Sequence, residues 1–280
     1  MTGPTIRRRQ LGIELQRLRE AAGVTRPAAA AAIGCSPARI AHIESGRNVL
    51  GKAELIVLLR DHYRAEDDLD RLEELRQEAS KRGWWSTYGL PETMAGYIGL
   101  ETDAVSVRCL ELENIPGLLQ TEQYMRRLCT LDVRLSATEL NKRVPARLYR
   151  QKRLVGTNPL QLTAVVSQAA LERCAREKDV AAEQLAQLLD RAKWPNVELR
   201  VLPFDIGLHV GMAGPFSLLR FPAGLLDDVA HQEYAVGGHL IDDDSVVSQL
   251  DTLFGELRSK SLGPNESLAL IAQLAKQTGQ

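Results

Sequence analysis

Long apolar runs are missing from this 280-residue sequence. No stretch reaches the roughly 18 apolar residues that a membrane-spanning helix needs, so we expect no membrane segment. Arginines at 7–9 follow the start of the chain, but the apolar core of a signal peptide does not come after them. We therefore expect no secretory leader and no association with a membrane.

Cysteine is scarce. The four cysteines are widely separated and form neither a C-x-x-C pair nor a Cys/His pattern of metal-ligand spacing: Cys35, Cys109, Cys129 and Cys174. This spacing argues against both a disulfide framework and a zinc site. We expect free thiols in a reducing cytoplasm, with neither a metal nor a cofactor.

The net charge is small, at −1, but it is unevenly distributed along the chain. Residues 1–64 hold eleven Lys and Arg against five Asp and Glu, whereas the remaining residues hold 24 against 31. A basic N-terminal part joined to a mildly acidic body suggests that the N-terminal end contacts a polyanion.

The N-terminal part contains a series of short helical patterns and no strand pattern. A stripe of leucines at helical spacing ends at Gly23, a typical helix terminator. Thr25 is expected to cap a second helix, and Ser36, which precedes a proline, a third helix that ends at Gly46. A fourth helix is predicted from about 52 to 62.

The second and third of these helices form a pair. They are joined by a tight turn at Gly34, and Ile33, Ile40 and Ile43 are placed to set the angle between them. In such a helix-turn-helix the second helix of the pair enters the major groove of duplex DNA, and its N-terminus can face a phosphate. We therefore expect the first sixty-odd residues to bind double-stranded DNA.

The segment 11–63 resembles the XRE-type, phage-repressor-like helix-turn-helix regulators on the pattern L-R…G-V-T…I-G-C-S…I-E-S-G-R. This resemblance implies that base edges are contacted by Arg26, Ala38, Arg39 and His42. The residues placed for phosphates, at the start of the third helix and just past its end, are Ser36, Arg47, Asn48 and Lys52. The family has a glutamate at the position of Glu44, where we expect it to tie the motif together.

The motif departs from the family at its second helix. The family usually has glutamine where Arg26 stands, and Pro27 follows it here. The alternative interpretation is a helical bundle that does not bind DNA. In that case we expect Arg26 and Arg39 to form salt bridges with the second domain.

A charged segment follows. Leu69, Leu72 and Leu75 keep a helical spacing among many acidic residues, which predicts a connecting helix. We place a helix-turn-helix domain of four to five helices at 1–64, the connecting helix at 65–83 and a second domain at 84–280.

The second domain alternates between strand and helix patterns. Strands are predicted at 107–115, 160–167, 197–204, 216–221 and 230–236. Helices are predicted at 121–131, 138–154, 180–192, 245–257 and 265–276. This order predicts an α+β domain with a mixed sheet.

Few residues of the second domain suggest chemistry. His231 and Glu233 share one strand face, but their spacing matches no zinc signature, and polar residues on an open sheet face are the simpler interpretation. A glycine-bearing loop at 206–216 is not followed by a helix, which favours a ligand-covering loop over a phosphate cradle. The candidate ligand or partner region comprises Trp84, Trp85, His209, Gly211, Gly214 and Glu233.

This domain also resembles the C-terminal domain of a large actinobacterial regulator family whose function is unassigned. The segments that carry the resemblance are W-W at 84–85, Y-I-G-L-E-T-D-A, I-P-G-L-L-Q-T-E-Q-Y, R-x-x-R-Q-x-x-L at 147–154, and V-E-L-R-V-L-P-F-D-I-G-L-H-V-G-M-A-G-P-F. The family usually has an acidic residue where Gln168 stands. The resemblance implies a regulator of development or secondary metabolism that acts beside a small protein encoded by a neighbouring gene, as in antitoxin–toxin pairs.

We therefore expect a cytoplasmic, nucleoid-associated transcription regulator, a repressor rather than an activator, that binds DNA as a homodimer. Its second domain would sense a small-molecule effector or a protein partner, and we expect no enzymatic activity. The alternative is an enzyme targeted to DNA, with His231 and Glu233 as its active pair. A cleft that holds both side chains against a bound cofactor would favour the enzyme. A closed apolar pocket near 209–214 would favour the small-molecule sensor, and a flat exposed apolar patch would favour the protein partner.

Overall fold

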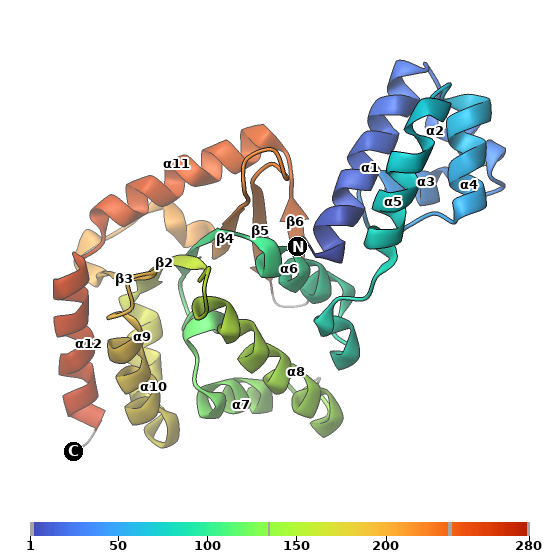
Figure 1. Cartoon of the computed structure of the whole chain (residues 1–280). Coiled ribbons are helices and arrows are strands. Elements are labelled where there is room, and N and C mark those ends of the chain that lie inside the picture. Colours follow the sequence, from blue (N-terminus) through green and yellow to red (C-terminus); the bar gives the residue numbers. More distant parts are fainter. Residues whose placement is uncertain (1–2, 134, 235–236, 279–280) are drawn as a thin grey trace. The chain divides into compact units, whose positions relative to one another are not determined.

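The computed structural model describes residues 3–133, 135–234 and 237–278 (Figure 1). The chain divides into two compact units. The N-terminal unit comprises residues 1–86 together with the short segment 223–226, and the C-terminal unit comprises residues 87–222 and 227–280. Each unit is described by itself.

The N-terminal unit is helical. Its helices are α1 (Pro4–Ala21), α2 (Arg26–Ala32), α3 (Pro37–Glu44), α4 (Lys52–Val57) and α5 (Leu69–Ser80), with a π-helical turn at Leu58–His62 and 3-10 turns at Glu66–Asp68 and Trp84–Tyr88. The hydroxyl of Thr25 accepts a hydrogen bond from the amide of Ala28, and that of Ser36 accepts one from the amide of Arg39. Both expected caps are therefore confirmed, and each leaves one fewer unsatisfied amide at a helix start.

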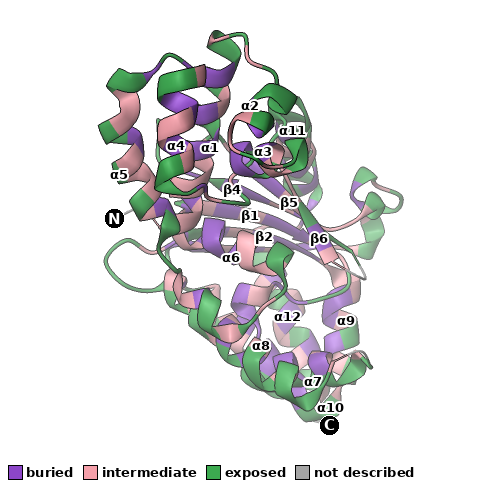
Figure 2. Ribbon diagram, turned by 90° about the vertical axis from the view of Figure 1, so that its right-hand side faces the viewer, coloured by how far each residue is buried: buried purple, intermediate pink, exposed green. Residues whose placement is uncertain are grey.

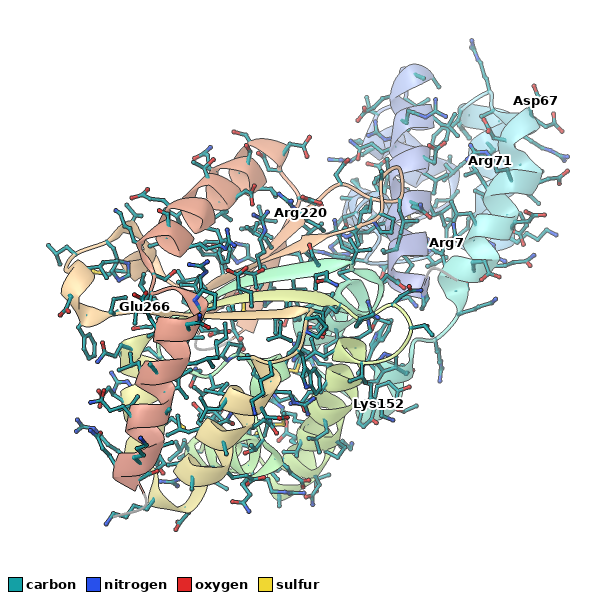
Figure 3. The ribbon with its side chains drawn as sticks, turned by 60° about the vertical axis from the view of Figure 1, so that its left-hand side comes forward. Arg7, Asp67, Arg71, Lys152, Arg220 and Glu266 are labelled. Atoms are coloured by element: carbon teal, nitrogen blue, oxygen red, sulfur yellow. The ribbon has the colours of Figure 1, made fainter. Side chains whose placement is uncertain are left out.

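One apolar core holds these helices together. Its largest members are leucines and isoleucines that are at most 2 % exposed: Leu11, Leu15, Ile40, Ile43, Leu50, Leu55, Leu58, Leu59 and Leu72. Helix α5 packs along α1 and contributes Leu72 and Ala79 to this core. Arg71, which is labelled in Figure 3, joins the two helices at their rim, because its Nη2 atom donates to Glu14 of α1 at 3.0 Å and to Asp68 at 2.7 Å.

Helix α1 crosses the end of α3 at very short range. A Cβ atom placed on Gly12 would lie 2.3 Å from the carbonyl oxygen of Glu44 and 2.6 Å from that of Ile43. Gly46, which follows α3, has a φ of 73° and would bring a Cβ within 2.8 Å of the amide nitrogen of Arg9. The crossing therefore requires glycine both at position 12 of α1 and at position 46, just after α3.

The C-terminal unit is built on a six-stranded mixed sheet. The strands are β1 (Ser106–Glu111), β2 (Gln161–Ser167), β3 (Val197–Leu202), β4 (Phe216–Arg220), β5 (Val229–Tyr234) and β6 (Gly237–Ile241), in the order β3-β2-β1-β4-β5-β6. Strands β1, β2 and β3 are parallel, whereas β4, β5 and β6 form an antiparallel meander beside β1. The strands on the parallel side are largely buried (Figure 2), as expected for a sheet covered on both faces.

Helices cover the two faces of this sheet unequally. The remaining helices are α6 (Glu92–Asp103), α7 (Glu122–Leu131), α8 (Ala137–Arg150), α9 (Gln168–Arg176), α10 (Lys178–Arg191), α11 (Asp244–Lys260) and α12 (Pro264–Thr278). Helix α11 packs on one face, where Phe254 and Leu257 are fully buried against Leu110 and Leu218. The helices α6, α8, α9, α10 and α12 lie on the other face (Figure 1).

The predicted fold class is confirmed: a helical N-terminal region is followed by an α+β domain with a mixed sheet. All five predicted strands and all five predicted helices of the second domain are present, and most of their bounds shift by a few residues. The end of the strand predicted at 230–236 lies outside the described residues, at 235–236. The sequence patterns did not predict β6, α6 or α9. None of the helices in the described ranges is long and apolar enough to span a membrane.

Replacing Gly12 with alanine is expected to destabilise the N-terminal unit by about 1–3 kcal/mol, because the new Cβ meets backbone carbonyls that cannot move independently of α3. Urea unfolding followed by circular dichroism measures this loss. Gly255→Ala is the control, since Gly255 lies inside α11 with nothing within 4 Å of its Cβ position. That variant should be neutral or gain up to about 1 kcal/mol from helix propensity. Equal effects of the two substitutions would contradict the close crossing.

Candidate functional sites

The exposed face of α3 forms the first candidate site. Pro37, Ala38 and His42 are exposed on this helix, and Arg39 is half-buried between them and the core. The side chain of Arg26, at the start of α2, is 46 % exposed. The structure thus places the four predicted base-contacting residues on α2 and α3, the helices of the predicted pair.

Arg39 is held in a two-point ion pair. Its Nη1 and Nη2 atoms donate to Oε1 and Oε2 of Glu54 at 2.6 Å and 2.9 Å. These two hydrogen bonds, donated by Arg39 and accepted by Glu54, raise the pKa of Arg39 above its ordinary value and lower the pKa of Glu54. Glu54 also accepts the amide of Gly51 at 2.7 Å, which anchors the start of α4. The guanidinium is therefore oriented by α4.

A buried carboxylate ties α1, α2 and α3 together. Glu44 is 5 % exposed and accepts Nε of Arg19 at 2.5 Å and Nε of Arg26 at 2.7 Å. The hydrogen bond to Glu44 also raises the pKa of Arg19. The expectation that Glu44 ties the motif together is confirmed. The ion-pair partners of both Arg26 and Arg39 belong to the N-terminal unit.

The predicted phosphate contacts surround α3. Arg47, Asn48 and Lys52 are exposed in the segment between α3 and the start of α4. The amides of Arg47 and Asn48 both donate to the carbonyl of His42, at 2.8 Å and 3.0 Å, which holds this turn against the end of α3. Ser36, at the other end of the helix, is exposed and acts as its N-cap.

Removing the charge of Glu44 should destabilise the N-terminal unit more than removing that of Glu54. Glu44→Gln leaves Arg19, whose side chain is 8 % exposed, without its buried counterion, and we expect a loss of about 3 kcal/mol or more. Glu54→Gln breaks a pair that is partly open to solvent and should cost about 1 kcal/mol or less. Urea unfolding of both variants measures the difference, and a smaller loss for Glu44→Gln would contradict the clamp.

The residues predicted as a ligand or partner region do not come together. Trp84 and Trp85 lie in the N-terminal unit, where Trp85 is 7 % exposed and its ring meets that of Trp84 edge to face at 5.8 Å. The loop with His209, Gly211 and Gly214 belongs to the C-terminal unit. A Cβ on Gly211 would lie 2.8 Å from Leu257 of α11, so this loop is on the α11 side of the sheet.

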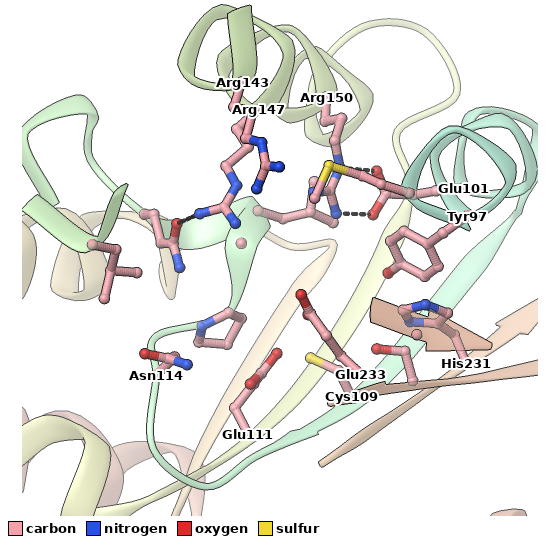
Figure 4. A pocket seen from close by; sticks show the side chains of 18 of the residues that line it. Tyr97, Glu101, Cys109, Glu111, Asn114, Arg143, Arg147, Arg150, His231 and Glu233 are labelled. Atoms are coloured by element: carbon pink, nitrogen blue, oxygen red, sulfur yellow. Dashed lines mark hydrogen bonds and ion pairs between the residues drawn. The ribbon is translucent and has the colours of Figure 1, made fainter. Parts of the chain in front are cut away.

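Glu233 lies elsewhere, in a pocket on the other face of the sheet. This pocket has a volume of about 630 Å³, a size suited to a small organic molecule. Its walls come from α6, from β1 and the segment after it, from α8, and from the ends of β5 and β6 (Figure 4). All of its lining residues belong to the C-terminal unit.

The strand register builds the floor of this pocket. Cys109 on β1 is paired with Ser217 on β4, which is paired with His231 on β5, so these three residues form one row across the sheet. Two residues further along their strands, Glu111 and Glu233 point to the same face. His231 also stacks against Tyr97 of α6, with ring centroids 4.5 Å apart.

Helix α8 supplies the opposite wall with three arginines. Arg143, Arg147 and Arg150 lie at spacings of four and three residues and therefore share one helix face. Arg150 donates two hydrogen bonds of 2.7 Å to Glu101, whose side chain is 1 % exposed. Its guanidinium also lies 5.3 Å from the centre of the Tyr97 ring. In Figure 4 Arg143 and Arg147 extend from α8 into the pocket above Glu111 and Glu233, whereas dashed lines join Arg150 to Glu101.

Gln120 links α8 to the segment that follows β1. Its amide nitrogen donates to the carbonyl of Ile115 at 2.7 Å, which leaves its side-chain oxygen to accept Nη1 of Arg147 at 3.2 Å. Its own carbonyl accepts the side chain of Gln151 at 2.6 Å. Three segments of the family resemblance therefore meet at this pocket: Y-I-G-L-E-T-D-A, I-P-G-L-L-Q-T and R-x-x-R-Q-x-x-L.

Burial shifts the pKa of two residues in the floor of the pocket. Burial, followed by the charge of Glu233, raises the pKa of Glu111 to about 8. Burial, followed by the charge of Arg150, lowers the pKa of His231 to about 4. At neutral pH Glu111 is therefore largely protonated and His231 is neutral. The thiol of Cys109 stays protonated too, because burial raises its pKa well above the ordinary value.

Two protein families match the chain. The helix-turn-helix domain family matches residues 10–75. The family described as a domain of unknown function, DUF5753, matches residues 94–273, which is more than half of the chain. The chain belongs to the DUF5753 family. No curated protein and no solved structure matches it.

The helix-turn-helix match indicates a DNA-binding regulator, and the DUF5753 match includes every wall of the pocket except the residues Pro91 and Thr93. Within the described residues, no group of three or more His, Cys, Asp or Glu side chains is arranged to hold a metal ion. The pocket offers instead hydrogen-bond donors on one wall and carboxyl groups on the other.

Several pocket residues were not among the sequence candidates, chiefly Tyr97, Glu111 and Arg147. The signal that pointed to two of them was the resemblance itself, since Tyr97 and Arg147 stand in quoted motifs. Gln168, the departure from the family pattern, lies away from the pocket lining and accepts the amide of Phe204 at 3.1 Å.

The raised pKa of Glu111 predicts a loss of stability of the DUF5753 domain as the pH rises. Between pH 6.5 and 8 the folded domain keeps this proton while the unfolded chain has released it, so the unfolding free energy falls with pH. Wild type should lose about 2 kcal/mol relative to Glu111→Gln over this range.

His231 does not interfere in that range. Its pKa is lowered to about 4, so it contributes stability that rises between pH 4 and 6.5 and is constant above. Urea unfolding of wild type and Glu111→Gln at both ends of the range measures the effect of Glu111. Parallel pH profiles of the two proteins would contradict a protonated Glu111 at neutral pH.

Proposed function

We propose that this protein is a transcription regulator of XRE type that binds operator DNA as a homodimer and represses its targets in the cytoplasm, at the nucleoid. The observation that carries the proposal is the helix-turn-helix domain at 10–75, with an exposed α3 in the most basic part of the chain. In this proposal two copies of α3 occupy successive major grooves about one helical turn apart.

Each side chain has a role in this proposal. Arg39 and Arg26 read guanine edges and His42 contributes a further base contact, while Ala38 offers only apolar contact to a thymine methyl group. Arg47, Asn48 and Lys52 hold phosphates and set the position of the helix without reading sequence. The ion pairs with Glu44 and Glu54 support this proposal because they orient the two arginines before DNA is bound.

The DUF5753 domain, in our proposal, senses a small molecule in the pocket. The support is a cavity of about 630 Å³ that holds both His231 and Glu233 beside three arginines. We propose that it binds its ligand without converting it. Of the two thiols that line it, Cys109 and Cys129, burial raises the pKa of Cys109 well above its ordinary value, which keeps that thiol in the protonated, unreactive form.

A second candidate function is the binding of a protein partner, such as the small protein of a neighbouring gene. It is favoured by four large apolar side chains in the loop with His209: Phe204, Leu208, Val210 and Met212, which are 58 %, 90 %, 51 % and 59 % exposed. Such a patch is typical of an interaction surface.

DNA binding is tested first by titration of the full chain against DNA from upstream of its own gene and against random DNA, at two salt concentrations. Arg39→Ala should lower affinity for the preferred site more than for random DNA, by at most the roughly 1–3 kcal/mol of a two-point base contact, because its contact with Glu54 offsets part of that value. Lys52→Ala should weaken binding to both DNAs and reduce the salt dependence by about one counterion. Equal losses on both DNAs for Arg39→Ala would contradict base reading.

The sensing role is tested with a pocket-filling variant. Ser217→Phe places a ring in the middle of the pocket floor and should shift the operator affinity at least several-fold, as a bound effector would. Leu208→Asp, in the exposed loop, is the matched change for the partner hypothesis and should leave the operator affinity of the isolated protein unchanged. If neither variant alters DNA binding, the pocket is not coupled to the operator.

A further inference from the structure

Two arginines one turn apart on α8 differ in how well their charge is compensated by partners in the protein. Arg150 is fully compensated, because both its contacts to Glu101 are 2.7 Å and the carboxylate is buried. Among the described residues Arg147 makes a single hydrogen bond, of 3.2 Å, to the neutral side chain of Gln120. Within the described part of the chain, its buried Nε atom has no hydrogen-bond partner.

A buried guanidinium with so few partners destabilises the folded domain. Burial, followed by the charge of Arg150, lowers the pKa of Arg147, which reflects the penalty on its charged form. A guanidinium nevertheless stays protonated and presents a planar set of donors that matches an oxyanion at two points. Arg143, one turn earlier on the same face, adds a second cation to the same wall. The wall therefore fits a carboxylate or a phosphate.

The facing wall has the opposite character. Glu111 and Glu233 stand on the same sheet face, and their carboxyl groups interact strongly enough that one hinders the ionisation of the other. The positive charge of a ligand amine in this position pairs with the carboxylate of Glu233 and favours the ionised form of Glu111, which is otherwise protonated at neutral pH. In Figure 4 both glutamates face the arginines of α8 across the pocket.

A further acidic group of the lining favours a ligand without a large net charge. Glu139, four residues before Arg143 on α8, lines the pocket, and its carboxylate accepts the amide and the hydroxyl of Ser136. This carboxylate would repel a polyanion. One anionic group and one cationic group on the same molecule satisfy both walls.

We propose that the pocket of the DUF5753 domain binds a zwitterionic small molecule whose carboxylate or phosphate is held by Arg147 and Arg143 and whose amine is held by Glu111 and Glu233. The proposal rests on the proposed sensing function and adds the chemical class of the effector. The volume of about 630 Å³ leaves room for a side group of several carbon atoms against Tyr97 and His231.

The first test uses the ligand-free full chain and compares two variants on one helix. Arg147→Met removes an uncompensated buried charge and should raise the Tm by a few degrees. Arg150→Met leaves Glu101 buried without its partner and should lower the Tm strongly. If Arg147→Met lowers the Tm as much as Arg150→Met, Arg147 is a structural residue and the proposal is overturned.

The second test measures the concentration-dependent rise in Tm with defined probes. Phenylalanine carries both groups with a carboxylate, and O-phosphoethanolamine carries both with a phosphate. The compound 3-phenylpropionate lacks the amine, and phenethylamine lacks the acid. We expect at least one zwitterion to stabilise wild type, and the truncated probes to do so at least tenfold less effectively. The carboxylate and phosphate probes distinguish the two sources of the anion.

Matched variants assign the effect to the pocket. Arg147→Met and Glu233→Gln should each abolish most of the stabilisation. Arg126→Met, which removes an exposed arginine of α7 paired with Glu122, should keep it. The proposal is overturned if no zwitterion raises the Tm, if 3-phenylpropionate acts as strongly as phenylalanine, or if Arg147→Met responds like wild type.

The tests of the ligand class and the test of the sensing function can fail independently. If Ser217→Phe alters operator binding while the zwitterions fail, the pocket is a sensor for another class of ligand. If the zwitterions bind in an Arg147-dependent manner but Ser217→Phe leaves operator binding unchanged, the ligand class stands and the regulatory role falls.

Discussion

The ion pair between Arg150 and Glu101 is the contact on which the DUF5753 domain depends most. It joins α8 to α6 across the pocket, with both side chains nearly closed to solvent. A buried pair of this kind adds little net stability, but removing either partner is costly, so it fixes the geometry of its surroundings. Tyr97, packed between the guanidinium of Arg150 and the ring of His231, transmits that geometry to the floor of the pocket.

The arginines of α2 and α3 and those of the pocket differ in how their charges are compensated. On the N-terminal unit the arginines of interest are already paired, Arg26 with Glu44 and Arg39 with Glu54. In the pocket, Arg147 has no carboxylate partner of its own, and Glu111 keeps its proton at neutral pH. In the first arrangement the charges of both arginines are already compensated within the protein. The second is a set of groups that only a ligand can satisfy.

Local sequence chemistry predicted most of the fold. Residues close together in the sequence determine the caps at Thr25 and Ser36 and the buried stripe of α3. The sequence pattern alone therefore predicts them. Strand β6 begins with two glycines, and α9 starts directly after β2 without a turn residue, which explains why neither was predicted. The pocket could not be derived in this way, because the order β1-β4-β5 brings together residues more than a hundred positions apart, such as Glu111 and Glu233.

The ion pair between Arg39 and Glu54 also limits how Arg39 could recognise a DNA base. The two terminal nitrogens that a guanine requires, for its O6 and N7 atoms, are the same two that now hold Glu54. Reading guanine through both nitrogens therefore exchanges one two-point contact for another. The affinity gained is the difference between them and not the full value of the base contact. A base that offers only one acceptor cannot replace both contacts to Glu54, so at such a base Arg39 stays paired with the carboxylate and adds no affinity.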